Sequence, residues 1–549
     1  MPRRVLSHPL SLLLLVTALF TFLIQSGELG TSDTTHRLQV THSLWTGQPQ
    51  VFPDEYPEFG LRGRGGRLYA WYGIGQSLLM LPADLLGTAA SHLPWWSAYT
   101  NSEADPSIRS IIVSISTNVI VNVFTAFAAF HLLGLFGFSP RESVIGTLTL
   151  LCATTHLHYA QNMTENNYIL LLTLTGFALH LQWLKTASQH ALFWGSAALG
   201  LNLLTRLTTV LDILGVAFFI LLALVFTRHE VSQSAHPPSS SKQTMLACLS
   251  GGTFRTYLLT AFPVYAAFFL LDRLYQYIRF DSWTNTYISV FAQEHREMNP
   301  ALPADFPFNG SWIHGGIDSG ILGPLFAPAK SIFLFDPMIL LSLLLAVLLW
   351  KKISPAMRAF LVATFAMLAA YILFYANYLW WAGDFAWGDR YISSIVELAT
   401  LLAIPLAIRY RQALGRTLCY LAILITAASI AIQVASLAFW LPLEIYQMNT
   451  FGPHTWVVFL RLKNIVAFTL GKRQAWGLNT PTMFSDPWDA AHITTWNFLP
   501  SLLRHICAAP LWVVYVLYVV WFAAALTLCF ASVKLARAVR SASAAPAKA

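Results

Sequence analysis

The chain has 549 residues, of which 56% are apolar and only 11% charged, and its mean hydropathy is +0.56. One water-soluble core cannot bury this much apolar surface, so the composition excludes a soluble enzyme and predicts a membrane protein. Five cysteines are too few for a disulfide-rich secreted scaffold. The net charge of +8 lies mainly between the apolar runs, so we expect a lipid bilayer and no nucleic acid as partner.

Apolar runs long enough to cross the ~30 Å hydrocarbon core of a bilayer recur along the chain. We count about twelve, which predicts an all-α integral membrane protein with one polytopic domain over 1–549. The first run also resembles a secretory signal, but no clear cleavage site follows it, so an uncleaved anchor is preferred. The runs lie near 9–25, 110–136, 143–160, 168–184, 191–205, 207–227, 257–275, 331–350, 358–381, 391–408, 417–440 and 508–533.

Arginine and lysine concentrate in alternate connections, and this positive-inside bias places both termini in the cytoplasm, with the chain in the plasma (inner) membrane. Three long polar connections then fall on the extracytoplasmic face, and we expect function there. They are a first outer loop at 26–107 with juxtamembrane helices, a second at 276–330 and a cap-like third at 441–506.

Nucleotide and metal chemistry have no signature in the chain. There is no Gly-rich nucleotide loop or Walker lysine, and cysteines and histidines lack the spacing of a zinc site. We therefore assign no cofactor and no metal, and leave a metal requirement open. An enzyme on the outer face would have to use something that the membrane supplies, such as a lipid-linked donor.

Residues 31–37, TSDTTHR, directly follow the first apolar run. The next apolar residues have the spacing of an amphipathic helix on the bilayer surface: Leu38, Val40 and Leu44. Asp33, at the boundary of water and lipid, is positioned to accept a proton. Asp33 could equally cap that helix or pair with Arg37 one turn later.

The same loop continues as RGRGGRLYAWYGIGQSLLMLP over 62–82. Its arginines and aromatic side chains, Tyr69 and Tyr72 among them, are typical of a membrane interface. Two interpretations explain this pattern equally well: a belt of membrane anchors that includes a turn, or part of a functional site.

These two segments together resemble the GT-C superfamily of polyprenyl-phosphate-sugar-dependent glycosyltransferases. Further stretches match family patterns in the family's order and cover most of the chain. They are Thr164-Glu165, GLNLLTR at 200–206, YQYIRF at 275–280, GPLFAPAKSIFLFDP at 323–337 and WWAGDFAWGDRY at 380–391.

The chain also departs from those patterns. Asp384 and Asp389 stand where the last motif has Gly and Pro, Gln276 replaces an Asn, and Asp281 replaces a Gly. These changes leave open which sugar fits. Asp389 would also partly neutralise the neighbouring Arg390.

The resemblance implies an inverting transfer from a polyprenyl-phosphate sugar to a hydroxyl of a protein, lipid or glycan acceptor. Asp33 would be the base, and Arg390 the main ligand of the donor phosphate, because a guanidinium presents a planar fork of donors. Further donor-phosphate ligands would be Arg206, Arg279 and Lys330, and supporting residues would be Arg37, Glu165, Tyr69 and Tyr72. The alternatives are interface anchors for Arg206 and Lys330 and a solvated loop acid for Glu165.

A secondary transporter or a lipid or glycan translocase is the competing class. It predicts two matching halves with interrupted helices and ionisable groups at mid-bilayer. The halves of this chain differ in loop length, and its ionisable residues lie mostly at the ends of apolar runs, with Asp212 the main exception and Asp272 a lesser one. The favoured interpretation is a GT-C-like membrane glycosyltransferase of the cell envelope.

Overall fold

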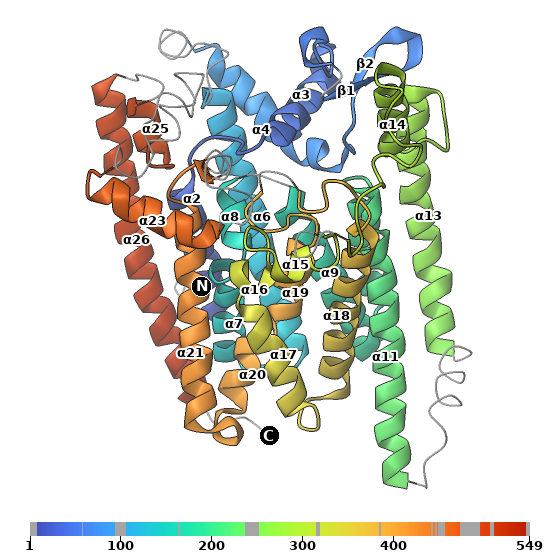
Figure 1. The fold of residues 1–549 in the computed structure, drawn as a ribbon. Helices are drawn as coiled ribbons and strands as arrows, with labels where there is room; N and C mark the ends of the chain where they lie inside the picture. The colour runs from blue at the N-terminus through green and yellow to red at the C-terminus, as the bar shows by residue number, and fades with distance from the viewer. Residues whose placement is uncertain are drawn as a thin grey trace.

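The computed structural model is a bundle of long helices with shorter helices and one hairpin gathered at one end (Figure 1). The described residues are 8–56, 59–93, 106–162, 165–235, 252–314, 319–383, 386–440, 443–444, 447, 456–472, 495–505 and 510–544.

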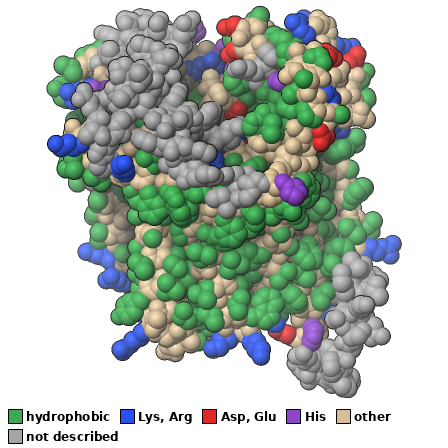
Figure 2. All heavy atoms as spheres, in the orientation of Figure 1, with side chains coloured by type: hydrophobic (Ala, Val, Ile, Leu, Met, Phe, Trp, Pro, Cys, Tyr) green, Lys and Arg blue, Asp and Glu red, His purple; other side chains and the backbone are tan. Residues whose placement is uncertain are grey.

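Seven helices among the described residues are long and apolar enough to cross a membrane. They are α6 (Ile108–Leu135), α9 (Glu165–Thr186), α11 (Val210–Ala235, preceded by the 3-10 turn Leu207–Thr209), α13 (Gly252–Phe280), α18 (Pro355–Tyr375), α21 (Arg411–Ser436) and α26 (Leu511–Ala544). Figure 2 shows hydrophobic side chains over the middle of this face of the bundle, with charged side chains toward its two ends. This is the surface of an integral membrane protein.

The other predicted runs are also helical, but they are shorter or broken. They are α2 (Pro9–Ile24), α7 (Pro140–Cys152) with α8 (His156–Gln161), α10 (Gln189–Leu203), α16 (Ile332–Phe335) with α17 (Met338–Leu349), and α19 (Ser393–Thr400) with α20 (Ala403–Arg409). At the break between α7 and α8, the backbone N–H of Thr155 donates to the Asp336 carboxylate. Twelve membrane crossings stay a prediction.

Most described parts of the three long connections lie toward one end of the bundle, but residues 323–326 lie near its middle (Figure 1). The first contains α3 (Ser32–Thr46), the 3-10 turns Pro53–Glu55 and Arg64–Gly66, the hairpin of β1 (Gly60–Arg62) and β2 (Leu68–Ala70), and α4 (Gly75–Ser91). The second contains α14 (Tyr287–Met298) and α15 (Gly323–Phe326), and the third α23 (Val457–Thr469) and α25 (Leu499–His505). In the hairpin, Leu61 pairs with Tyr69 in antiparallel register.

The helix expected after the first apolar run is α3. Asp33 neither caps this helix nor pairs with Arg37, which were the two structural alternatives. Thr31 is the N-cap residue, and its hydroxyl accepts the backbone N–H of Thr34. Asp33 lies inside the first turn, where a carboxylate also interacts favourably with the helix dipole. Its ion-pair partner is Arg390, not Arg37. That α3 lies on a bilayer surface stays a prediction.

A fully buried carboxylate anchors α3 to the bundle. Asp84 of α4 accepts hydrogen bonds from Trp45 Nε1 (2.9 Å) and Arg109 Nε (2.5 Å), and His42 Nδ1 lies 3.1 Å from it. These partners come from α3 and α6, so one side chain joins three helices. Because a buried charge is costly unless it is paired, this junction fixes where α3 presents Asp33.

Candidate active site

Asp33 is held from two sides. Its Oδ2 accepts Arg390 Nη1 at 2.8 Å, and its Oδ1 accepts the Tyr72 hydroxyl at 2.9 Å. The side chains of Asp33 and Arg390 are 22% and 16% exposed, so a substrate can still reach them. The two predicted principal residues, 357 positions apart in the chain, are therefore in direct contact.

Glu165, at the start of α9, is clamped between two arginines. Arg37 Nη1 donates to its Oε2 at 2.5 Å, and Arg206 Nη2 donates to its Oε1. Glu165 is only 4% exposed, so it is not the solvated loop acid of the alternative interpretation. The Arg37 guanidinium also lies over the Tyr72 ring, 4.4 Å from its centroid. One contact network thus joins Glu165 to Asp33 through Arg37 and Tyr72.

Neighbouring residues hold both the backbone and the guanidinium of Arg390 in place. Asn166 Nδ2 donates to the Arg390 carbonyl at 2.9 Å and to Ser393 Oγ at 2.8 Å. The Tyr391 ring lies 5.3 Å from the Arg390 guanidinium and 5.2 Å from that of Arg206. Gly383, with φ +70°, passes so close that a Cβ there would lie 2.3 Å from Arg390 Cγ. Only glycine fits that position without displacing the arginine.

The cluster carries an excess of positive charge. Three guanidinium groups face two carboxylates, a net charge of +1, and the groups are Arg37, Arg206, Arg390, Asp33 and Glu165. Burial raises the pKa of Asp33, but the charges of Arg390 and Arg37 lower it by more, so its pKa lies below the ordinary carboxyl value. Burial and the Asp33 charge raise the pKa of Tyr72 well above the ordinary value, so its hydroxyl stays a donor.

Three predicted site residues lie outside this network. Lys330 Nζ donates to the carbonyls of Ala386 and Gly388, at 2.8 and 3.1 Å, and so supports the segment that carries Arg390. Arg279, 1% exposed, donates to the carbonyls of Ala70 and Tyr72. Tyr69 packs edge-on against Phe280. Their predicted contact with a donor remains a prediction.

Asp389 turns away from its neighbouring arginine. Its Oδ1 accepts the backbone N–H of Tyr391 at 3.0 Å, whereas the Arg390 guanidinium bonds Asp33. Burial raises the pKa of Asp389 to about 7 despite nearby positive charges, so at neutral pH it is partly protonated and neutralises Arg390 less than the sequence suggests. Asp384 and Thr164 lie outside the described residues.

Among the described residues, no group of three or more His, Cys, Asp or Glu side chains is arranged to hold a metal ion. The described cysteines, Cys152, Cys419 and Cys529, are free thiols.

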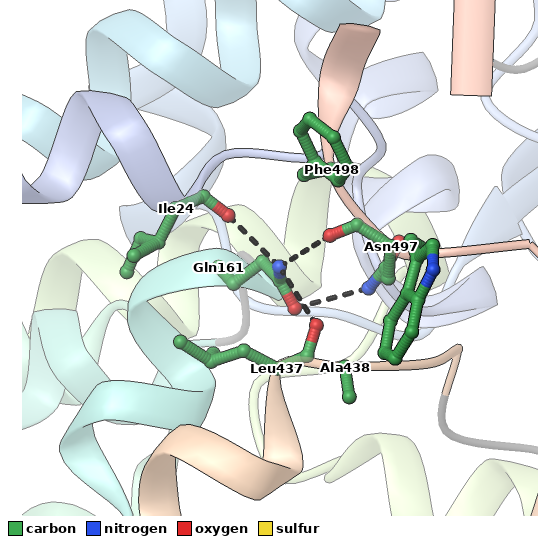
Figure 3. A pocket seen from close by; sticks show the side chains of 7 residues that line it. Ile24, Gln161, Leu437, Ala438, Asn497 and Phe498 are labelled. Carbon is green, nitrogen blue, oxygen red and sulfur yellow. Dashed lines mark hydrogen bonds between the residues drawn. The ribbon is translucent and has the colours of Figure 1, made fainter. Parts of the chain in front are cut away.

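A cavity of about 180 Å³ lies elsewhere, around Gln161 at the end of α8 (Figure 3). Gln161 Nε2 donates to the carbonyls of Ile24 and Asn497, at 2.8 and 2.7 Å, and Oε1 accepts Asn497 Nδ2. The lining also includes Leu437 and aromatic side chains. None of the predicted site residues lines this cavity, so we interpret Gln161 as a junction between α2, α8 and the third connection.

Comparison with solved structures gives a likeness of fold. No protein-family model matches the chain, and no curated protein matches it. A structure that it resembles is the crystal structure of the Archaeoglobus fulgidus oligosaccharyltransferase in the apo form, with 13% sequence identity and a TM-score of 0.43. The match covers 78% of this chain and 55% of that one, so this chain spans about half the length of that protein. What this chain does has to be inferred from its own residues.

Sequence reasoning missed Asn166 and Tyr391 as parts of the site. Asn166 follows Glu165 at the start of an apolar helix, and a polar amide at that boundary is the signal that could have found it. Tyr391 is the last residue of the WWAGDFAWGDRY motif, which assigns it no role, yet its ring contacts two of the three arginines.

The two carboxylates should differ in their contribution to stability. Glu165→Gln leaves Arg37 and Arg206 without their buried partner and should destabilise the protein by about 3–5 kcal/mol. Asp33→Asn, at a partly exposed pair, should cost about 1 kcal/mol or less. Denaturant unfolding of the purified protein in mild detergent measures both. Equal losses, or a larger loss for Asp33→Asn, would contradict this ranking.

Proposed function

We propose that this protein is an inverting membrane glycosyltransferase that uses a polyprenyl-phosphate-linked sugar and glycosylates an acceptor hydroxyl on the extracytoplasmic face. The observation that carries the proposal is the contact of Asp33 with Arg390 inside a cluster of net positive charge. The motif resemblance along the chain supports the same function. In this proposal the cluster faces the outside of the plasma membrane and both termini are cytoplasmic.

Asp33 is the base in this mechanism. It takes the proton of the acceptor hydroxyl while the acceptor oxygen attacks the anomeric carbon, and the bond from that carbon to the donor phosphate oxygen breaks. The electron pair leaves with the polyprenyl phosphate. Because its pKa is lowered, Asp33 is ionised at neutral pH before the substrate arrives. Tyr72 keeps one carboxylate oxygen oriented.

Arg390 binds the leaving phosphate. The phosphodiester of the donor carries one negative charge, like the carboxylate that Arg390 contacts now, and the phosphate monoester that leaves carries more. A guanidinium can bind either through two parallel hydrogen bonds. When Arg390 turns to the phosphate, Asp33 loses its strongest positive partner and becomes a better base. Arg37 and Arg206 stay on Glu165 and act on the phosphate through their field.

Asp212 is the main exception to the placement of ionisable residues at the ends of the apolar runs, and so it is the residue that most favours the transporter alternative. The structure places this residue in the first turn of α11, where Thr173 and Tyr371 donate to it. It therefore lies near an end of its helix and has its hydrogen bonds satisfied within the bundle, which does not favour a transport site at mid-membrane.

The lipids that co-purify with the protein test donor and roles together. We expect Asp33→Asn to retain a polyprenyl-phosphate sugar, because it can bind the donor but cannot activate the acceptor. Arg390→Ala should lose that lipid. Mass spectrometry of extracts from wild type and both variants measures this, with Glu142→Gln, whose carboxylate pairs with Arg409, as the folded control. Bulk phospholipid alone in every sample, with full cellular function of Asp33→Asn, would overturn the proposal and favour a transporter.

The pH dependence of transfer follows from Asp33. Its pKa lies below the ordinary carboxyl value of about 4, so protonation removes the base only at low pH. With the donor identified by the lipid analysis, kcat/KM in proteoliposomes should stay level from about pH 7 to 5 and fall below about 4. An acidic limb centred near pH 6 would show that a different group is the base.

A further inference from the structure

A second acidic cluster lies buried inside the bundle, among residues that the proposed mechanism does not use. Thr155, at the break between α7 and α8, bridges two carboxyl groups. Its Oγ1 lies 3.0 Å from Asp336 Oδ2 and 3.0 Å from Glu397 Oε1. Asp336, Glu397 and Thr155 are 2%, 0% and 1% exposed.

If both carboxyl groups are ionised, Thr155 has one hydrogen too few to form a separate hydrogen bond with each of them. An ionised carboxylate only accepts hydrogen bonds, and a threonine hydroxyl has a single hydrogen to donate. A single hydrogen shared between two carboxylates would bond each of them weakly, so two full hydrogen bonds at 3.0 Å require a second hydrogen, which one carboxyl group supplies when it is protonated. Within the described residues, no lysine or arginine forms an ion pair with either group, so two charges here would be uncompensated.

We propose that Glu397 is a buried proton-binding site, held as a neutral carboxylic acid that donates to Thr155, while Thr155 donates to ionised Asp336. The two carboxyl groups differ in their partners. Asp336 accepts both the hydroxyl and, at 2.6 Å, the backbone N–H of Thr155, and such short contacts are typical of an ionised acceptor. Glu397 has only the contact to the hydroxyl.

An unpartnered imidazole nitrogen faces the other oxygen of the Glu397 carboxyl group. His156 Nδ1 and Glu397 Oε2 each have no hydrogen-bond partner, and they lie 3.7 Å apart. His156 is 1% exposed, and its Nε2 is 2.9 Å from Asn122 Oδ1. Because Nε2 faces an amide oxygen, it carries the imidazole hydrogen and Nδ1 is an acceptor. His156 is therefore placed to accept the acid proton of Glu397 when that proton is on Oε2, and not when it is on the Oε1 that contacts Thr155.

The proton site joins three interruptions of the bundle. Thr155 precedes α8, Asp336 ends α16 just before Pro337, and Glu397 lies in α19. It lies close to the Arg390 segment, because Phe335 stacks edge-on against Trp387 and the Tyr159 hydroxyl donates to the Trp387 carbonyl. The site itself stands on hydrogen-bond geometry and does not depend on glycosyl transfer.

Infrared difference spectroscopy of the purified protein at neutral pH tests this proposal. Wild type should show carbonyl stretches of un-ionised carboxylic acids that shift in D2O. Glu397→Gln should lose one of them, whereas the contribution of partly protonated Asp389 should remain. That variant should melt close to wild type, because a neutral amide donor replaces a neutral acid. Glu142→Gln, at a carboxylate paired with Arg409, should keep all the bands. A Glu397→Gln spectrum with the same acid bands as wild type would overturn the proposal.

Thr155→Val supplies a second readout if Glu397→Gln does not fold. It keeps the side-chain shape but removes the hydroxyl that accepts the Glu397 hydrogen bond. We expect the acid band of Glu397 to shift in frequency, and an unshifted band would overturn the assignment.

Discussion

The site depends on one electrostatic constraint, which is that two partly or fully buried carboxylates must share three guanidinium groups. Glu165 forms ion pairs with Arg37 and Arg206. Arg390 pairs with Asp33 instead, so it is the arginine that can exchange its carboxylate for a substrate phosphate. Because Asp33 is the more exposed carboxylate, the pair that a substrate can reach is also the pair that chemistry would use. The ion pairs of Glu165, which stay in place, thus orient the Asp33–Arg390 pair, which opens when substrate binds.

The fold supplies these charges from distant parts of the chain. Asp84 anchors α3, so Asp33 and Arg37 face the start of α9, where Glu165 and Asn166 lie. Arg390 comes from the connection before α19, and its backbone is held by Asn166. Each contact is made by a helix end or a loop, and the long apolar helices serve as the scaffold that holds these ends together.

The sequence predicted much of this architecture, because hydrophobic periodicity reports helices and the connections between them directly. Every predicted apolar run is at least partly helical within the described residues, and Asp33, Arg37, Glu165, Arg206 and Arg390 form one cluster. Periodicity says nothing about tertiary partners, however, so it could not decide between Arg37 and Arg390 as the partner of Asp33. It also could not indicate that Lys330 and Arg279 bond backbone carbonyls, since a motif specifies a residue type and not its orientation.

The central claim is that Arg390 exchanges the Asp33 carboxylate for a donor phosphate. A cryo-electron microscopy structure of the protein with a polyprenyl-phosphate sugar tests it most directly. We expect the donor phosphate within about 3 Å of the Arg390 guanidinium, and an Asp33 carboxylate released from that arginine and open to an acceptor. A donor bound elsewhere, with the Arg390–Asp33 ion pair still intact, would contradict it.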